Sequence, residues 1–108
     1  MKRVVCVALV LLAFRSEAFD AGGAKRFFNT YGCNGCHAVD EQRIGPRFRD
    51  VANRYRAEGE AVVARLAAKI RSGGAGNWGL VPMISNPKLG EEQAREIAAW
   101  IVALPEKP

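Results

Sequence analysis

The sequence predicts an all-α domain of about four to five helices. Apolar residues recur at helical spacing in several segments, and no run shows sustained alternation of apolar and polar residues. The chain has 108 residues, of which 49% are hydrophobic and 25% charged, which is the composition of one ordinary globular domain. A helical domain of this size has only a small apolar core of its own.

The first 18 residues are typical of a targeting segment that is not part of the fold. A basic start is followed by 11 apolar residues from Val4 to Phe14, and the small residues Ser16 and Ala18 suit cleavage after Ala18. An uncleaved membrane anchor or a buried helix is the alternative, but a bilayer span needs about 20 apolar residues. We therefore predict a cleaved secretory signal peptide over residues 1–18 and export to the periplasm.

The mature domain, residues 19–108, is expected to be mildly basic. Cleavage would remove three basic residues and one acidic residue, which lowers the formal net charge from +5 to +3. The basic residues are dispersed, so nucleic-acid binding is not indicated. This charge suits either an acidic protein partner or simply a solvated surface. We expect no stable membrane insertion after cleavage, because residues 19–108 contain no further long apolar run.

Four segments of the mature domain have the pattern of amphipathic helices. The first begins after Asp20, whose side chain suits an N-cap, and Gly32 follows its expected end. Gly73 or Gly74 is expected to supply a left-handed cap to the third helix, and Pro105 stops the last. The predicted bounds are Asp20 to Tyr31, Arg47 to Tyr55, Glu60 to Arg71 and Gly90 to Leu104.

Residues 33–37 contain the strongest chemical signal, Cys-Asn-Gly-Cys-His. This run is the signature of covalent c-type haem attachment. Positions three apart on a helical turn share a face, so Cys33 and Cys36 can both form thioether bonds to one porphyrin. His37 follows directly and can turn its imidazole to the iron as an axial ligand.

Three other uses of this motif compete with haem. A disulfide between Cys33 and Cys36 would close a very short loop and stabilise little. A thioredoxin-like redox pair needs a βαβ context, which the flanking sequence lacks. A tetrahedral zinc site needs four ligands, and the mature chain offers two cysteines and one histidine.

Met83 is the candidate for the second axial ligand of the iron. The chain has no second histidine, and Met1 lies in the segment predicted to be removed. Pro82 and Pro87 flank Met83 and restrict the backbone on both sides, which suits a weak thioether ligand. The alternative is that Met83 is a gap-filling core residue.

Several further motifs follow the attachment site in order. They are Ile44-Gly45-Pro46, Asn77-Trp78-Gly79, Val81-Pro82-Met83 and Ile97-Ala98-Ala99-Trp100-Ile101. With the Cys-x-x-Cys-His run, they make residues 20–104 resemble the small bacterial class I cytochromes c of the c551/c552 (c8) group. The resemblance implies a class I cytochrome c fold wrapped around one covalently bound haem.

The resemblance also implies roles for individual residues. Pro46 matches a proline whose carbonyl accepts a hydrogen bond from the proximal histidine. Trp78 matches a tryptophan that donates its indole N–H to a haem propionate, and either Lys69 or Arg71 is expected to pair with the other propionate.

Three further positions match the family. Asn86 matches an asparagine near the sulfur of the axial methionine. Phe28 and Trp100 match the crossing of the first and last helices. Ile84 and Ser85 depart from many relatives, which carry two prolines directly after the methionine.

Occupied axial positions on both faces of the haem favour one-electron transfer over substrate chemistry. We therefore expect an electron carrier rather than an enzyme, monomeric and shuttling between a donor complex or dehydrogenase and a terminal reductase or oxidase of a respiratory chain. One alternative is a dedicated haem subunit bound stably to one periplasmic oxidoreductase. The other is a haem sensor or peroxidase-like protein in which Met83 does not bind the iron.

Overall fold

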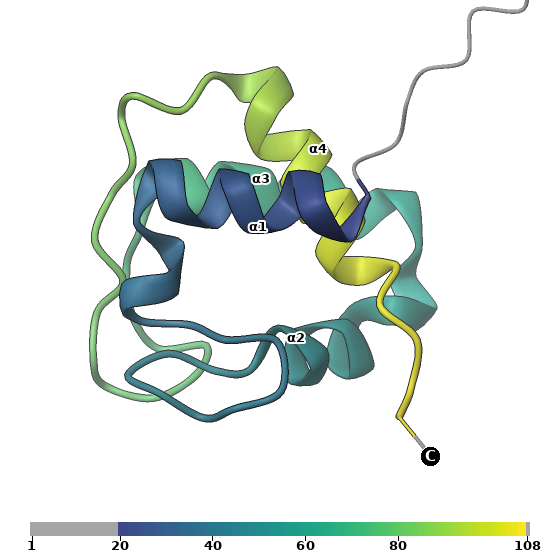
Figure 1. Cartoon of the computed structure of the whole chain (residues 1–108). Coiled ribbons are helices and arrows are strands. Elements are labelled where there is room, and N and C mark those ends of the chain that lie inside the picture. Colours follow the sequence, from purple (N-terminus) through teal and green to yellow (C-terminus); the bar gives the residue numbers. More distant parts are fainter. Residues whose placement is uncertain (1–19, 108) are drawn as a thin grey trace, which may run out of the picture.

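The computed structural model describes residues 20–107; the predicted signal peptide, residues 1–18, lies outside the described residues. Four α-helices and two short 3₁₀ turns make up the regular structure (Figure 1). Over residues 20–107 no helix is long and apolar enough to cross a membrane. The all-α prediction is confirmed, with these bounds: α1 Ala21–Tyr31, a turn at Cys33–Gly35, α2 Phe48–Tyr55, a turn at Arg56–Glu58, α3 Glu60–Ser72 and α4 Glu91–Val102.

Helix α1 begins and ends at the predicted signals. The Asp20 carboxylate accepts a hydrogen bond of 2.6 Å from the Gly23 amide, which satisfies one of the free N–H groups at the helix start. Gly32 has φ 74° and ψ 13°, a left-handed conformation that costs glycine little. The chain therefore leaves the helix abruptly and enters the Cys33–Gly35 turn.

The ends of α3 and α4 differ from the prediction in detail. Gly73 follows α3 with positive φ (69°), but its ψ of −159° is extended, so neither it nor Gly74 (φ 121°) forms a left-handed helical cap. The physical reason is that Gly74 pairs its backbone with Met83, which requires extended chain. Helix α4 ends at Val102, so Leu104 lies beyond it.

The apolar core forms where α1, α3 and α4 meet, with α2 packed against α4 on the other side (Figure 1). The Phe28 ring contacts Trp100 edge-on, at 5.7 Å between centroids, which joins the first helix to the last as the resemblance implied. Phe28 also stacks on Phe48 of α2 at 4.8 Å. Leu89, which lies in a loop and was not expected in the core, is among the most deeply buried side chains.

A surface ion-pair network ties the 38–49 segment to the C-terminal tail. Asp40 accepts a hydrogen bond from Arg49 at 2.7 Å and pairs with Lys107 at 3.1 Å. Arg49 also donates to the Pro105 carbonyl at 2.6 Å. The hydrogen bond from Arg49, followed by that from Lys107, lowers the pKa of the Asp40 carboxyl to about 2.

Because the folded pKa of Asp40 is depressed, this network stabilises the fold above the unfolded pKa of about 3.9 and fades as the pH falls towards 2. We expect Asp40→Asn to lower the urea midpoint at pH 7, with a difference from wild type that shrinks between pH 4 and pH 2. Glu41→Gln is the control, since Glu41 makes only a longer 3.7 Å pair with Arg43, and it should change the midpoint less. A difference for Asp40→Asn that is constant with pH would contradict the network's role.

Candidate functional site

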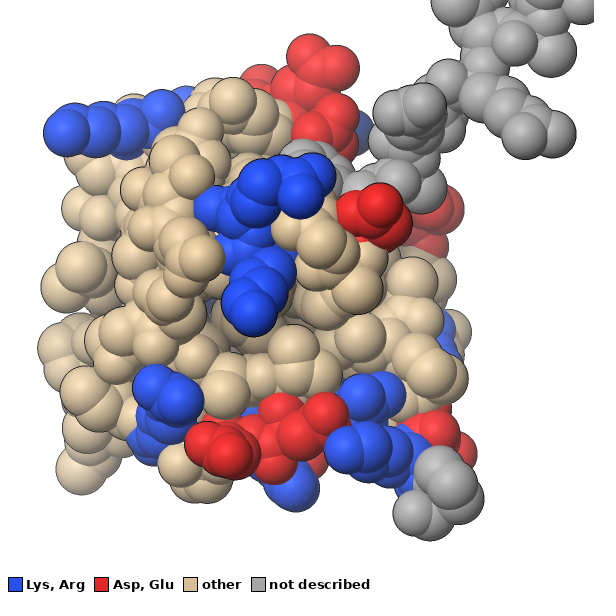
Figure 2. All heavy atoms as spheres, viewed as in Figure 1, with Lys and Arg blue, Asp and Glu red and all other residues tan. Residues whose placement is uncertain are grey.

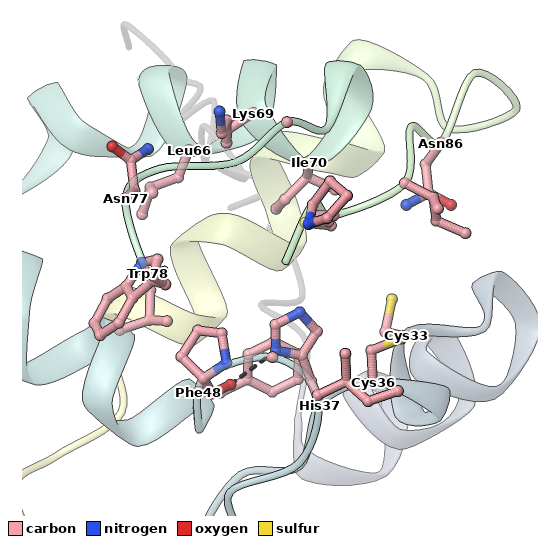
Figure 3. Close-up of a pocket in the computed structure, with 18 of the residues that line it drawn as sticks. Cys33, Cys36, His37, Phe48, Leu66, Lys69, Ile70, Asn77, Trp78 and Asn86 are labelled. Carbon is pink, nitrogen blue, oxygen red and sulfur yellow. Dashed lines mark hydrogen bonds between the residues drawn. The ribbon is translucent and has the colours of Figure 1, made fainter. Parts of the chain in front are cut away.

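A largely apolar cavity of about 390 Å³ lies between α2 and the layer formed by α1, α3 and α4 (Figure 3). Its walls include Leu66 and Ile70 from α3, and Ile97 and Ile101 from α4. The cavity is lined by all seven residues that the motifs and the family resemblance assigned to the haem site: Cys33, Cys36, His37, Pro46, Trp78, Met83 and Asn86.

The two cysteines reach the cavity from the turn that follows α1. The amides of Cys36 and His37 donate to the Cys33 carbonyl at 3.2 and 2.9 Å, so the motif is wound into a tight turn. Both thiols are free and half-buried, and burial raises the pKa of the Cys33 thiol above its ordinary value. No disulfide therefore joins Cys33 to Cys36.

His37 is held from three sides, and its ring reaches into the cavity (Figure 3). Its Nδ1 lies 2.8 Å from the Pro46 carbonyl oxygen. A carbonyl can only accept, so Nδ1 carries the proton and Nε2 of the neutral ring keeps a free lone pair. Phe48 stacks on the ring at 4.8 Å, and Gly45 lies so close that a Cβ there would come within 2.3 Å of His37 Cε1.

The segment that carries Met83 is fixed to the end of α3 by backbone pairing. Gly74 and Met83 exchange two hydrogen bonds, of 2.9 and 2.8 Å, and the Asn86 amide donates to the Arg71 carbonyl at 3.0 Å. This pairing restrains the Met83 backbone although Ile84 and Ser85, rather than prolines, follow it. Met83 is half-buried and lines the cavity.

The close approach of the Met83 segment depends on Gly73. A Cβ at Gly73 would lie 2.4 Å from the Met83 carbonyl oxygen, and Gly73 has positive φ. We expect Gly73→Ala to cost about 4 kcal/mol in urea unfolding, about half from backbone strain and half from overpacking. Gly59→Ala is a matched control: Gly59 has similar backbone angles (φ 59°, ψ −142°) but no neighbour within 4 Å. It should show only the strain, about 2 kcal/mol; equal costs for both variants would disprove the close packing.

The two basic residues expected near the cavity are placed differently. Lys69 lines the cavity, whereas Arg71 donates its Nε to the Leu89 carbonyl at 3.0 Å and does not line it. Trp78 lines the opposite side of the cavity from the cysteines (Figure 3). Arg54 packs over the Trp78 ring at 4.6 Å, a contact that no sequence pattern indicated.

The geometry does not favour a metal-ion centre made by protein ligands alone. Over residues 20–107, no group of three or more His, Cys, Asp or Glu side chains is arranged to hold a metal ion. Two free thiols, an imidazole with one free nitrogen and a thioether instead border one apolar space. These donors and this lining fit a flat, largely apolar macrocycle with an iron centre.

Comparison with known proteins agrees with this chemistry. The family described as cytochrome c matches residues 21–105. The chain belongs to the cytochrome c family. Cytochrome c-551 of Azotobacter vinelandii is 43% identical over 79 residues, covering 72% of this chain and 93% of the relative. Cytochrome c-552 of Hydrogenobacter thermophilus is 35% identical over 104 residues, covering 96% and 99%.

A solved structure shows the same fold. The crystal structure of Nitrosomonas europaea cytochrome c552 superposes with a TM-score of 0.70 and 32% identity, covering 75% of this chain and 99% of that one. As a member of the family, the cytochrome binds one haem c covalently, and Cys33 and Cys36 are its attachment residues. Its relatives are electron-transfer proteins, so the cytochrome is an electron carrier that acts with redox partners and not an enzyme.

Proposed function

We propose that this cytochrome is a periplasmic single-electron carrier whose haem iron is bound by His37 on one face and Met83 on the other. Bound haem c supplies the one-electron Fe(III)/Fe(II) couple. The observation that carries the proposal is that the free Nε2 side of a pinned His37 ring and the restrained Met83 border the same cavity as both thiols.

His37 and Met83 have complementary tasks in this proposal. The hydrogen bond to Pro46 fixes the tautomer of His37 and makes Nε2 a stronger electron-pair donor to the iron. The paired backbone of Met83 supplies the rigidity that a weakly binding thioether needs. Together they leave no open axial position, and methionine ligation favours the ferrous state.

Other cavity residues are proposed to set the haem's polar surroundings. Trp78 is assigned a hydrogen bond from its indole N–H to one propionate, and Lys69 pairs with the other. Asn86, half-buried beside the Met83 segment, is assigned a contact near the methionine sulfur. Lys69 lies in α3, and Trp78 and Asn86 lie in the loop that follows it, so one local segment of the chain supplies all three side chains.

Export to the periplasm rests on the N-terminal segment. The match to the Hydrogenobacter relative covers 96% of the chain, so it extends into residues 1–18. Export would place the mature protein in the periplasm. There it could accept electrons from a quinol-oxidising complex or a dehydrogenase and pass them to a terminal reductase or oxidase. We propose that the mature protein is a monomer.

Partners are proposed to dock where apolar side chains surround the cavity. Leu80, Val81 and Ile84 are exposed on the loop between α3 and α4, and Ile44 is exposed on the facing segment. Figure 2 shows few charges over that loop, on the left of the view, while charges of both signs alternate along the lower edge. Small, weakly charged contacts of this kind suit short-lived electron-transfer complexes.

Mass spectrometry of the protein purified from periplasm tests the proposal. The expected mass is that of residues 19–108 plus one haem, and the ferric spectrum should contain the weak red band of methionine–iron ligation. A mass without haem, or a retained leader, would refute the corresponding part. A pull-down from the same extract separates a free shuttle from a dedicated haem subunit, which would co-purify stoichiometrically with one oxidoreductase.

A further inference from the structure

Arg54 of α2 is not one of the residues assigned to the haem site, but it contacts two residues of the cavity wall. Its Nη1 donates to the Asn77 carbonyl at 2.6 Å, and its guanidinium carbon lies 4.6 Å from the centre of the Trp78 ring. Asn77 and Trp78 both line the haem cavity. Arg54 therefore joins α2 to the loop after α3 across 23 positions of the sequence.

Trp78 depends on this contact because it is otherwise poorly enclosed. The side chain is 43% exposed, and its other aromatic neighbour, Tyr55, meets it edge-on at 6.4 Å. The loop on either side contains Gly76 and Gly79, both with positive φ, joined by a 3.0 Å backbone hydrogen bond. A planar cation stacked on the indole face and bonded to the preceding carbonyl fixes both the ring and the backbone.

The charge of Arg54 is also uncompensated. Within residues 20–107 it takes part in no ion pair, whereas the nearby Arg65 pairs with Glu58 at 2.9 Å. Arg54 is exposed to solvent, but its guanidinium stacks on Trp78, which is part of the cavity wall. A fixed positive charge there favours the reduced state, which carries one positive charge fewer.

We propose that Arg54 is a positioning residue that locks Trp78 against the haem and, through its charge, raises the reduction potential. This inference rests on the proposed function, in which Trp78 donates to a propionate. Arg54 itself contacts Trp78 and the Asn77 backbone, so it acts on the haem through them and through its field.

Two substitutions separate the two effects. Arg54→Gln removes both the charge and the stacking on Trp78. Arg54→Lys keeps the charge but loses the planar group that stacks on Trp78 while it bonds to the Asn77 carbonyl. Spectroelectrochemistry of the holoprotein should show that Arg54→Gln lowers the equilibrium constant for reduction about threefold, or about 30 mV for one electron. Arg54→Lys should stay close to wild type in this measurement.

Hydrogen exchange of the Trp78 indole N–H, followed by NMR of the ferrous protein, reports on positioning. We expect about tenfold faster exchange in both variants, since each loses the stack and the Asn77 bond. The indole of Trp100, which packs on Phe28 in the core, is the internal reference and should be unchanged. Arg26→Gln on α1 is the matched charge control, because Arg26 is exposed like Arg54 but, unlike Arg54, makes no cation–π contact within the described residues.

The outcomes are decisive in both directions. Faster Trp78 exchange in both variants, with a lower potential in Arg54→Gln alone, supports the inference. Unchanged exchange in both variants, or a potential shift in Arg54→Gln no larger than in Arg26→Gln, overturns it. Every sample is first checked for covalent haem and for the methionine–iron band, so failure of the proposed function would be seen before and apart from failure of this inference.

Discussion

Replacing Met83 with alanine is expected to lower the reduction potential of the holoprotein on the order of 0.2 V, a fraction of the about 0.8 V that axial ligands span. The reason is that the thioether favours ferrous iron and alanine supplies no ligand in its place. The opened axial position should also bind CO rapidly in the ferrous protein. Potentiometry, the ferric red band and CO binding measure the three consequences.

Met83→His and Ile84→Ala are the controls for this prediction. Histidine restores a ligand, so the potential should fall while CO stays excluded. Ile84 is exposed directly beside Met83 and should tolerate alanine with the methionine–iron band intact. If Met83→Ala left the potential and CO reactivity at wild-type values, Met83 would be a packing residue and the sensor or peroxidase-like alternative would gain support.

The bounds of α1 were predictable because their signals are local. The Asp20 carboxylate lies three residues from the amide it caps, and Gly32 needs only its own backbone freedom to end α1. The burial of Leu89 was not predictable in the same way. It lies in a loop without helical periodicity, and its position depends on how α3 and α4 enclose it.

In the candidate site, too, the features with local sequence signals were predictable and those that depend on packing were not. The Cys33–His37 run indicates haem attachment within five consecutive residues. Met83 was predicted as the second axial ligand by elimination, because the chain offers few other candidates. Lys69 and Arg71 could not be separated, because residues two apart on a helix point in different directions and only the packing of α3 shows which one meets the cavity. The contacts of Gly73 with Met83 and of Arg54 with Trp78 join distant segments, so no local pattern encodes them.

Gly45 is required for a different reason than its place in the sequence indicates. Beside Pro46 it predicts a turn, and its lack of a side chain looks like a requirement of turn geometry. Its φ is not positive, so the backbone itself does not demand glycine. The requirement comes from His37, whose ring occupies the space that a Cβ would fill.

Gly45→Ala is accordingly expected to destabilise the holoprotein by about 3 kcal/mol, because the new methyl group would overlap His37 Cε1 and Nδ1 while Phe48 blocks the ring's retreat. The displaced ring should also lose its 2.8 Å hydrogen bond to Pro46, which the NMR signal of the His37 ring N–H reports directly. Gly35→Ala, inside the attachment motif, has no neighbour within 4 Å of its Cβ and should change urea stability by no more than about 0.5 kcal/mol. Equal stabilities for the two variants would mean that the His37 ring moves freely. The proposal that a tightly held imidazole serves as an axial ligand would then be wrong.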